Sequence, residues 1–132
     1  MPILQNMKIH ENISLKPYNT FGMDSRARYF IHARSEDDVE QAVLWAREKE
    51  MPLLVLSGGS NMLVTEDLDA VVLHMDIAGI EIVGKDGSDT LVRVAAGENW
   101  HGFVQWAVGQ NLAGIESLAF IPGRVGSSPV QN

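Results

Sequence analysis

Cysteine is absent from the 132-residue sequence. Its absence excludes disulfide bonds, thiolate metal sites and cysteine nucleophiles, and it favours a reducing compartment such as the cytoplasm. Long apolar runs are missing too, because no stretch approaches the roughly 20 residues that a membrane-spanning helix needs. The opening residues are interrupted by Gln5, Asn6 and Lys8, so no secretory signal is predicted. We therefore expect a cytoplasmic protein with no membrane partner.

Basic residues are few and scattered. Ten lysines and arginines stand against 17 aspartates and glutamates, which gives a net charge of −7. A nucleic-acid groove requires a basic stripe, so a nucleic-acid partner is not expected. A small anion could still be held by backbone N–H groups rather than by cationic side chains. The hydrophobic content of 45% suits a globular core, and the length suits one domain or slightly more.

The first half of the sequence predicts two strands joined by a helix. Residues 28–33 have strand character, and Ser35 with Asp38 three positions later forms a capping-box pattern at a helix start. Apolar residues then recur with helical spacing until Pro52, which ends the helix. Residues 53–56 form a short apolar run, as in a buried parallel strand. The order predicts a βαβ crossover. Residues 71–73 offer a further strand of the first half.

The second half has a different pattern. Residues 80–83 and 90–94 flank a polar loop that contains Asp86-Gly87, which predicts an antiparallel hairpin. Residues 100–108 carry apolar side chains at helical spacing, and their aromatic rings are expected in a core.

Two glycine-rich loops are candidate anion sites. The first, SGGSN at residues 57–61, lacks both the G-x-G-x-x-G dinucleotide motif and the lysine of a P-loop. Its glycines could let N–H groups converge on a phosphate, but glycine pairs are also common in plain turns, and both interpretations stay open. The second, residues 122–128, adds unhindered donors, hydroxyls and the cation of Arg124, although such a segment near a chain end is often mobile.

Other catalytic chemistry is not indicated. The four histidines are too far apart in the sequence to predict a metal site, and each is expected at the surface or in a hydrogen bond: His10, His32, His74 and His101. Residues 65–69 lack the glycine and final glutamate of a calcium loop. Glu98 has no neighbour that would tune it as a base. We predict no catalytic residue and no metal ligand set.

Four motifs occur in order along the chain: residues 19–22 (NTFG), 56–61 (LSGGSN), 96–101 (AGENWH) and 121–132 (IPGRVGSSPVQN). In this order and spacing they closely resemble the UDP-N-acetylenolpyruvoylglucosamine reductase family, also called UDP-N-acetylmuramate dehydrogenases. The resemblance runs from about Ser14 to Asn132.

The resemblance implies an α+β fold of the PCMH type, the FAD-binding fold of vanillyl-alcohol oxidase. A βαβ subdomain is followed by a truncated antiparallel one. The expected division is an N-terminal arm at residues 1–27, a first FAD-binding subdomain at 28–73, and the start of a second at 74–132. Family members are longer, and their catalytic serine, glutamate and arginine and their substrate domain match regions beyond residue 132. The chain alone is therefore expected to be inactive.

The resemblance also implies the cofactors and the reaction. NADPH reduces FAD, which then reduces UDP-N-acetylglucosamine enolpyruvate to UDP-N-acetylmuramate, in bacterial peptidoglycan synthesis and hence in cell wall biogenesis, cell shape and cell division. The implied FAD-binding residues are Leu56, Ser57, Gly58, Gly59, Ser60, Asn61, Met62, Pro122, Gly123, Gly126, Ser127, Gln131 and Asn132. A side chain at Gly59 is expected to displace FAD and leave the fold intact. Many relatives have glycine at Ser57 and a small residue at Arg124.

Two alternatives remain at this point. The chain could be a non-catalytic folded fragment that does not bind FAD tightly, or it could belong to another PCMH-type flavoprotein such as an oxidase.

An unpaired strand edge in the second subdomain would favour self-association of the chain.

Overall fold

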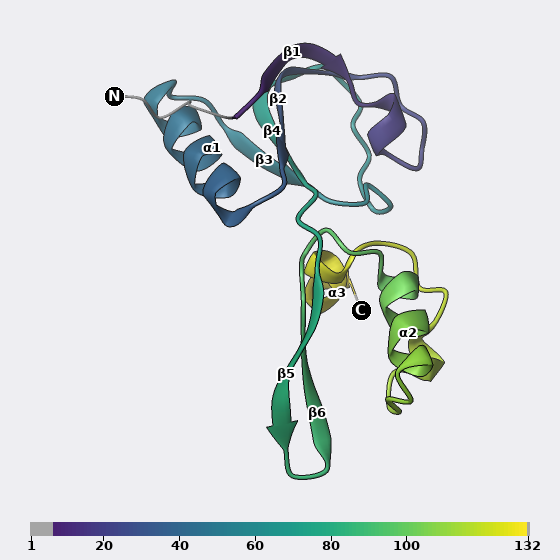
Figure 1. Cartoon of the computed structure of the whole chain (residues 1–132). Coiled ribbons are helices and arrows are strands. Elements are labelled where there is room, and N and C mark those ends of the chain that lie inside the picture. The colour runs from purple at the N-terminus through teal and green to yellow at the C-terminus, as the bar shows by residue number, and fades with distance from the viewer. Residues whose placement is uncertain (1–6, 132) are drawn as a thin grey trace. The chain divides into compact units, whose positions relative to one another are not determined.

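The computed structural model describes residues 7–131 of the chain (Figure 1). Two compact units, Met1–Asp76 and Ile77–Asn132, divide the chain. The sequence places this boundary between residues 73 and 74. The strand β4 (Leu68–Met75) extends past that point, which moves the division to the C-terminal side of Asp76.

A four-stranded sheet forms the first unit, in the order β1-β2-β4-β3. β2 (Arg26–Ala33) and β3 (Leu53–Leu56) each lie parallel to β4, and α1 (Glu36–Glu48) connects them. The predicted parallel arrangement is therefore confirmed, with β4 inserted between the two strands that α1 joins. β1 (Ile9–Ser14) pairs antiparallel with β2. β1 lies within the residues predicted as an arm. It is not predicted as a strand, because the exposed polar residues at its centre interrupt the apolar pattern.

The helix α1 starts where the sequence places it. The Ser35 hydroxyl accepts a hydrogen bond from the Asp38 N–H at 3.1 Å, and the Asp38 carboxylate accepts one from the Ser35 N–H at 3.1 Å. This reciprocal pair is the predicted capping box. Three acidic residues, at positions 36–38, lie in the first turn, where negative charge suits the helix dipole.

Successive strand residues point to opposite faces of the first sheet, and each face carries one core cluster. One face carries Ile31, Val71 and Leu73, which pack against the apolar side of α1. The other carries Phe30 and Val72, and its cover comes from loops and a single 3-10 turn, Lys16–Tyr18, rather than from an α-helix. The covering residues in this second core cluster are Leu15, Tyr18, Met62 and Val64.

The second unit is a hairpin with short helices. β5 (Ile80–Asp86) and β6 (Asp89–Val94) pair antiparallel, as predicted, with an irregularity between Ile82 and Gly84. α2 (Trp100–Gly109) begins at Asn99, whose side chain accepts a hydrogen bond from the Gly102 N–H at 2.9 Å. Single 3-10 turns at Glu116–Leu118 and Val125–Ser127 lead to α3 (Ser128–Gln131).

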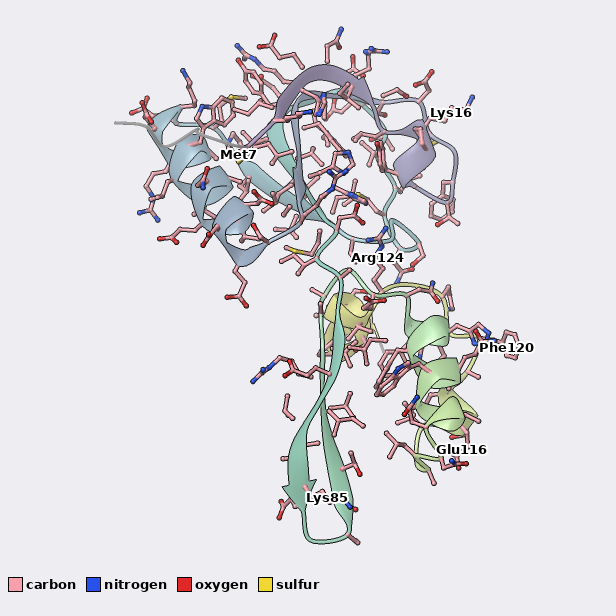
Figure 2. The ribbon with its side chains drawn as sticks, viewed as in Figure 1. Met7, Lys16, Lys85, Glu116, Phe120 and Arg124 are labelled. Atoms are coloured by element: carbon pink, nitrogen blue, oxygen red, sulfur yellow. The ribbon has the colours of Figure 1, made fainter. Side chains whose placement is uncertain are left out.

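The core of the second unit is small. Among its described residues only Val104 and Ala107 are buried hydrophobics. Large apolar side chains stay exposed on the hairpin, and the Phe120 ring, 83% exposed, projects outward from this unit (Figure 2). Across residues 7–131, no helix is both long enough and apolar enough to cross a membrane.

Candidate cofactor site

The first glycine-rich loop follows β3, at the carboxyl end of the parallel strands. Ligands of open α/β sheets bind at such an edge. The loop is hydrogen-bonded to the NTFG motif. The Gly59 carbonyl accepts hydrogen bonds from the Thr20 N–H at 3.1 Å and from the Thr20 hydroxyl at 3.0 Å. Two motifs that lie far apart in the sequence thus form one local structure.

Gly59 is required by this contact. Its φ is +67°, and a Cβ there would lie 2.0 Å from the Tyr18 carbonyl oxygen and 2.9 Å from the Asn19 Cα. The expectation that a side chain at Gly59 leaves the fold intact is therefore wrong, since backbone at 2.0 Å has to move. The glycine serves the approach of the loop to residues 18–19, whatever it does toward a ligand.

Asn19 fixes the segment that holds the loop. Its buried side chain donates to the carbonyls of Leu15 and Met23, at 2.7 and 2.9 Å, and accepts a hydrogen bond from the Met23 N–H at 2.9 Å. All three bonds stay inside residues 15–23. The role of Asn19 is therefore to shape this segment.

The Ser57 hydroxyl is one of two buried side-chain polar atoms without a hydrogen-bond partner among the described residues; the other is the Gln41 Oε1, on α1. A buried hydroxyl without a partner costs about 1–3 kcal/mol, so such groups call for an explanation. Ser57 is the first residue after β3, directly before the two glycines. A polar ligand atom at this loop would satisfy it, which fits the phosphate interpretation better than a plain turn.

The remaining predicted residues of this loop divide into two kinds. Gly58, Ser60 and Asn61 are exposed or half-buried and can face a ligand. Leu56 and Met62 belong to the core cluster behind the loop. Leu56 as a whole is 2% exposed, so its side chain packs in the core and does not face a ligand.

The second loop pairs with the AGENWH motif. The Gly126 N–H donates to the Ala96 carbonyl at 3.0 Å, and the Trp100 N–H donates to the Gly123 carbonyl at 3.1 Å. A Cβ on Gly126 would lie 2.7 Å from the Ala96 Cβ, so this glycine, too, is set by a close approach. The structure therefore brings together the third and fourth motifs within the second unit, as it does the first and second within the first unit.

Side chains of the second loop are largely engaged in shaping it. Arg124 donates from Nη1 to the Gly97 carbonyl at 3.1 Å. The hydroxyls of Ser127 and Ser128 donate to the Arg124 and Val125 carbonyls at 2.9 and 2.8 Å. Arg124 thus has a structural role, which the sequence left undefined. Pro122 is exposed. The side chain of Gln131 and all of Asn132 lie outside the part of the chain that the structure describes.

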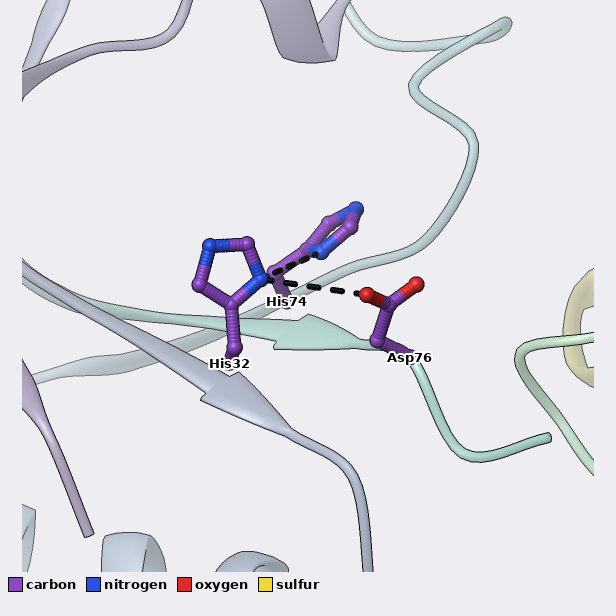
Figure 3. Close-up of side chains that lie close together, drawn as sticks. All are labelled: His32, His74 and Asp76. Atoms are coloured by element: carbon purple, nitrogen blue, oxygen red, sulfur yellow. Dashed lines mark hydrogen bonds and ion pairs between the residues drawn. The ribbon is translucent and has the colours of Figure 1, made fainter.

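Sequence reasoning missed one cluster. His32 and His74 are partners in register across β2 and β4, with Asp76 just beyond β4 (Figure 3). Burial lowers the pKa of His32, and the positive charge of Arg34 adds to this, while Asp76 opposes it. Their separation of 42 positions concealed the pair. The signal that could have found it is that each histidine stands next to last in its strand.

Sequence comparisons found one matching family and several similar proteins. Residues 27–132 match the sequence profile of a family described as an FAD binding domain. The chain is 51% identical over 127 residues to the UDP-N-acetylenolpyruvoylglucosamine reductase of Pseudomonas aeruginosa and 44% identical over 126 residues to that of Flavobacterium johnsoniae. Each alignment covers 96% of this chain, but 38% and 37% of the respective relative.

A solved structure is also similar to this chain. The crystal structure of UDP-N-acetylenolpyruvylglucosamine reductase from Thermus caldophilus matches with a TM-score of 0.66 and 30% identity, over 92% of this chain and 41% of that one. The chain thus spans less than two fifths of the length of the curated relatives it matches.

Proposed function

Because the chain belongs to the FAD binding domain family, whose profile its residues 27–132 match, we propose that it is the FAD-binding part of a UDP-N-acetylenolpyruvoylglucosamine reductase. Its α+β fold is of the PCMH type, as the sequence predicts. The observation that carries the proposal is the buried Ser57 hydroxyl without a partner in the loop after β3. The first two motifs are hydrogen-bonded to each other in the first unit, and the last two are hydrogen-bonded to each other in the second unit.

The residues of the chain fit a dinucleotide cofactor in chemical terms. Backbone N–H groups around Gly58 and the hydroxyls of Ser57 and Ser60 are donors for a pyrophosphate. All of these donors are uncharged. In the second unit, the loop around Gly123 and Gly126 offers exposed or half-buried backbone. FAD would supply two-electron hydride chemistry, with NADPH as the electron source.

The whole protein would then reduce the enolpyruvyl double bond of UDP-N-acetylglucosamine enolpyruvate. One hydride and one proton are added, and UDP-N-acetylmuramate results. This step belongs to peptidoglycan synthesis, so cell wall biogenesis, cell shape and cell division would depend on it. The need for NADPH and the lack of cysteine both suit the cytoplasm. We place the substrate contacts and the proton donor in the part of the relatives that this chain does not span.

A chimera tests the proposal. This chain replaces the matching segment of the Pseudomonas aeruginosa reductase, with which it shares 51% identity. We expect the chimera to be purified with bound flavin, seen in its visible absorption, and to oxidise NADPH when the enolpyruvyl substrate is present. The isolated chain, assayed with added FAD, is the control and is expected to be inactive. A chimera with native-like circular dichroism but no flavin after FAD is added would contradict the proposal.

A further inference from the structure

His32, His74 and Asp76 form a compact group at the carboxyl end of β2 and β4. The two histidines are direct neighbours across the parallel strand pair, and their Nδ1 atoms lie 3.3 Å apart. The Asp76 Oδ2 lies 4.0 Å from the His32 Nδ1. One ligand atom from each residue lies within 4.8 Å of the other two. Figure 3 shows the three side chains converging from the two strands and from the residue after them.

From this geometry we propose that His32, His74 and Asp76 bind a divalent transition-metal ion of the Zn²⁺ class. A tetrahedral Zn²⁺ with bonds of about 2.0–2.1 Å to nitrogen holds two ligand atoms roughly 3.3 Å apart. The two Nδ1 atoms already have this spacing. The Asp76 Oδ2 lies 4.0 Å from the His32 Nδ1 and would have to move closer to reach the same spacing. Two imidazoles and one carboxylate leave a fourth position for water.

The surroundings hold the rings in place. Tyr18 lies edge-on to His74 with 5.1 Å between ring centroids, and Phe30 stacks on His74 at 5.9 Å. Phe30 also lies edge-on to His32, at 5.0 Å. His74 itself is 5% exposed. Ligands whose rotamers are fixed by packing lose little entropy when a metal binds, so the site is largely preorganised.

The site has an entry path. His32 and Asp76 keep part of their side chains exposed, at 28% and 34%. An open groove runs along His32, with His10 and Arg34 also on its wall. Arg34 is a positive charge that opposes a cation here, and Asp76 offsets it. A water molecule could reach the fourth coordination position from this side.

A hydrogen bond between the two histidines would explain the 3.3 Å contact without a metal. In that case one Nδ1 donates and the other accepts, so the two rings need different tautomers. In the metal complex both Nδ1 atoms bind the ion, and both protons lie on Nε2. The two states are therefore distinguishable by the nitrogen that carries the proton.

Metal titration of the chain tests the proposal. The chain is produced without a polyhistidine tag, stripped with chelator and titrated with Zn²⁺ against a chelating dye, and with Co²⁺ by visible absorption. We expect one ion per chain, the absorption bands of four-coordinate Co²⁺, and ¹⁵N shifts of both histidines that place the metal on Nδ1. Failure to bind either ion, or Nδ1 protonation in the presence of equimolar Zn²⁺, would overturn the proposal.

Variants identify the ligands. His32→Gln and Asp76→Asn change half-exposed residues, so the fold should survive, and each should weaken Zn²⁺ binding at least tenfold. His10→Gln is the matched control, because its ring lies 6.2 Å from that of His32 without being a ligand. Folded Asp76→Asn protein that binds Zn²⁺ as the wild type does would exclude Asp76, and unchanged binding by His32→Gln would refute the site. The proposal stands independently of FAD, because every measurement uses the flavin-free chain.

Discussion

Gly59 and Gly22 have the same backbone angle for different reasons. Both have φ of +67°, but a Cβ on Gly22 meets nothing within 4 Å, whereas one on Gly59 meets the Tyr18 carbonyl oxygen at 2.0 Å. The pair therefore separates the cost of a left-handed backbone from the cost of a steric clash. The first applies at both positions and the second at Gly59 alone.

Alanine at the two positions measures this difference. We expect Gly22→Ala to lower the free energy of unfolding by about 1 kcal/mol, the usual cost of a positive φ for a residue with a Cβ. Gly59→Ala should cost at least about 2 kcal/mol more, because backbone has to shift. Urea denaturation of both variants gives the values. Equal losses would show that the approach of residues 18–19 is not rigid.

Ser57 should behave unlike a serine with a partner. Without FAD, Ser57→Ala removes a buried unpaired hydroxyl and should leave stability unchanged or raise it. Ser25→Ala is the matched control: the buried Ser25 hydroxyl donates to the Val64 carbonyl at 2.9 Å, and its loss should cost about 1 kcal/mol.

With FAD the order should reverse. If Ser57 donates to the cofactor, Ser57→Ala should weaken FAD binding about tenfold in the flavin-loaded chimera, whereas Ser25→Ala should not. Flavin release during stepwise dilution measures this. If the two variants release flavin at the same rate, the Ser57 loop is a plain turn and not a phosphate site.

At the scale of elements, α1 depends on its capping box. Ser35→Ala removes the hydroxyl that accepts from the Asp38 N–H, and we expect a loss of about 1 kcal/mol in the free energy of unfolding. Ser35→Thr keeps the hydroxyl and should cost much less. Amide exchange in the first turn of α1 should rise in the alanine variant. An equal loss in both variants would place the effect elsewhere than in the cap.

The strands were predicted unequally well for a physical reason. β2 and β3 contain apolar runs that pack into the two core clusters, so composition alone indicates them, although β3 is an edge strand with Val55 54% exposed. β1 is an edge strand with polar residues at its centre, so its residues are predicted only as part of an arm. Its pairing is decided by hydrogen bonds to β2, which leave no apolar signal in the sequence.

At the scale of the whole molecule, the two units should differ in stability. The first buries two core clusters, whereas Val104 and Ala107 are the buried hydrophobics among the described residues of the second. We expect amides of β2 and β4 in the isolated chain to exchange slowly, and amides after Gly97 to exchange much faster. Hydrogen exchange followed by mass spectrometry checks this. Uniform protection through Val125 would contradict it.

The second unit should also promote self-association of the isolated chain. Its exposed large apolar residues are Ile82, Val83, Leu91, Val108, Leu118, Phe120 and Val130. Apolar surface of this kind recruits other chains, as do unpaired strand edges. Light scattering should show a mass that rises with concentration. Glu in place of Ile82, Leu91 and Phe120 should reduce it, and a monomer at all concentrations would refute the expectation.

The sequence by itself determined the local structures. A capping box, a hairpin turn at Asp86-Gly87 and an apolar strand such as 53–56 are encoded by neighbouring residues, because side-chain period and turn chemistry act over a few positions. The four motifs likewise predicted FAD binding, since their order is a property of the sequence, and residues 27–132 match the FAD binding domain family.

Only the tertiary structure decided which distant residues meet. It brought Tyr18 against Gly59, buried the Ser57 hydroxyl and placed His32 beside His74. Strand order and register set these contacts, and both result from packing of the two sheet faces. Residues 41 or 42 positions apart carry no local signal of that register, so histidines that the sequence separates become neighbours only once β2 and β4 pair.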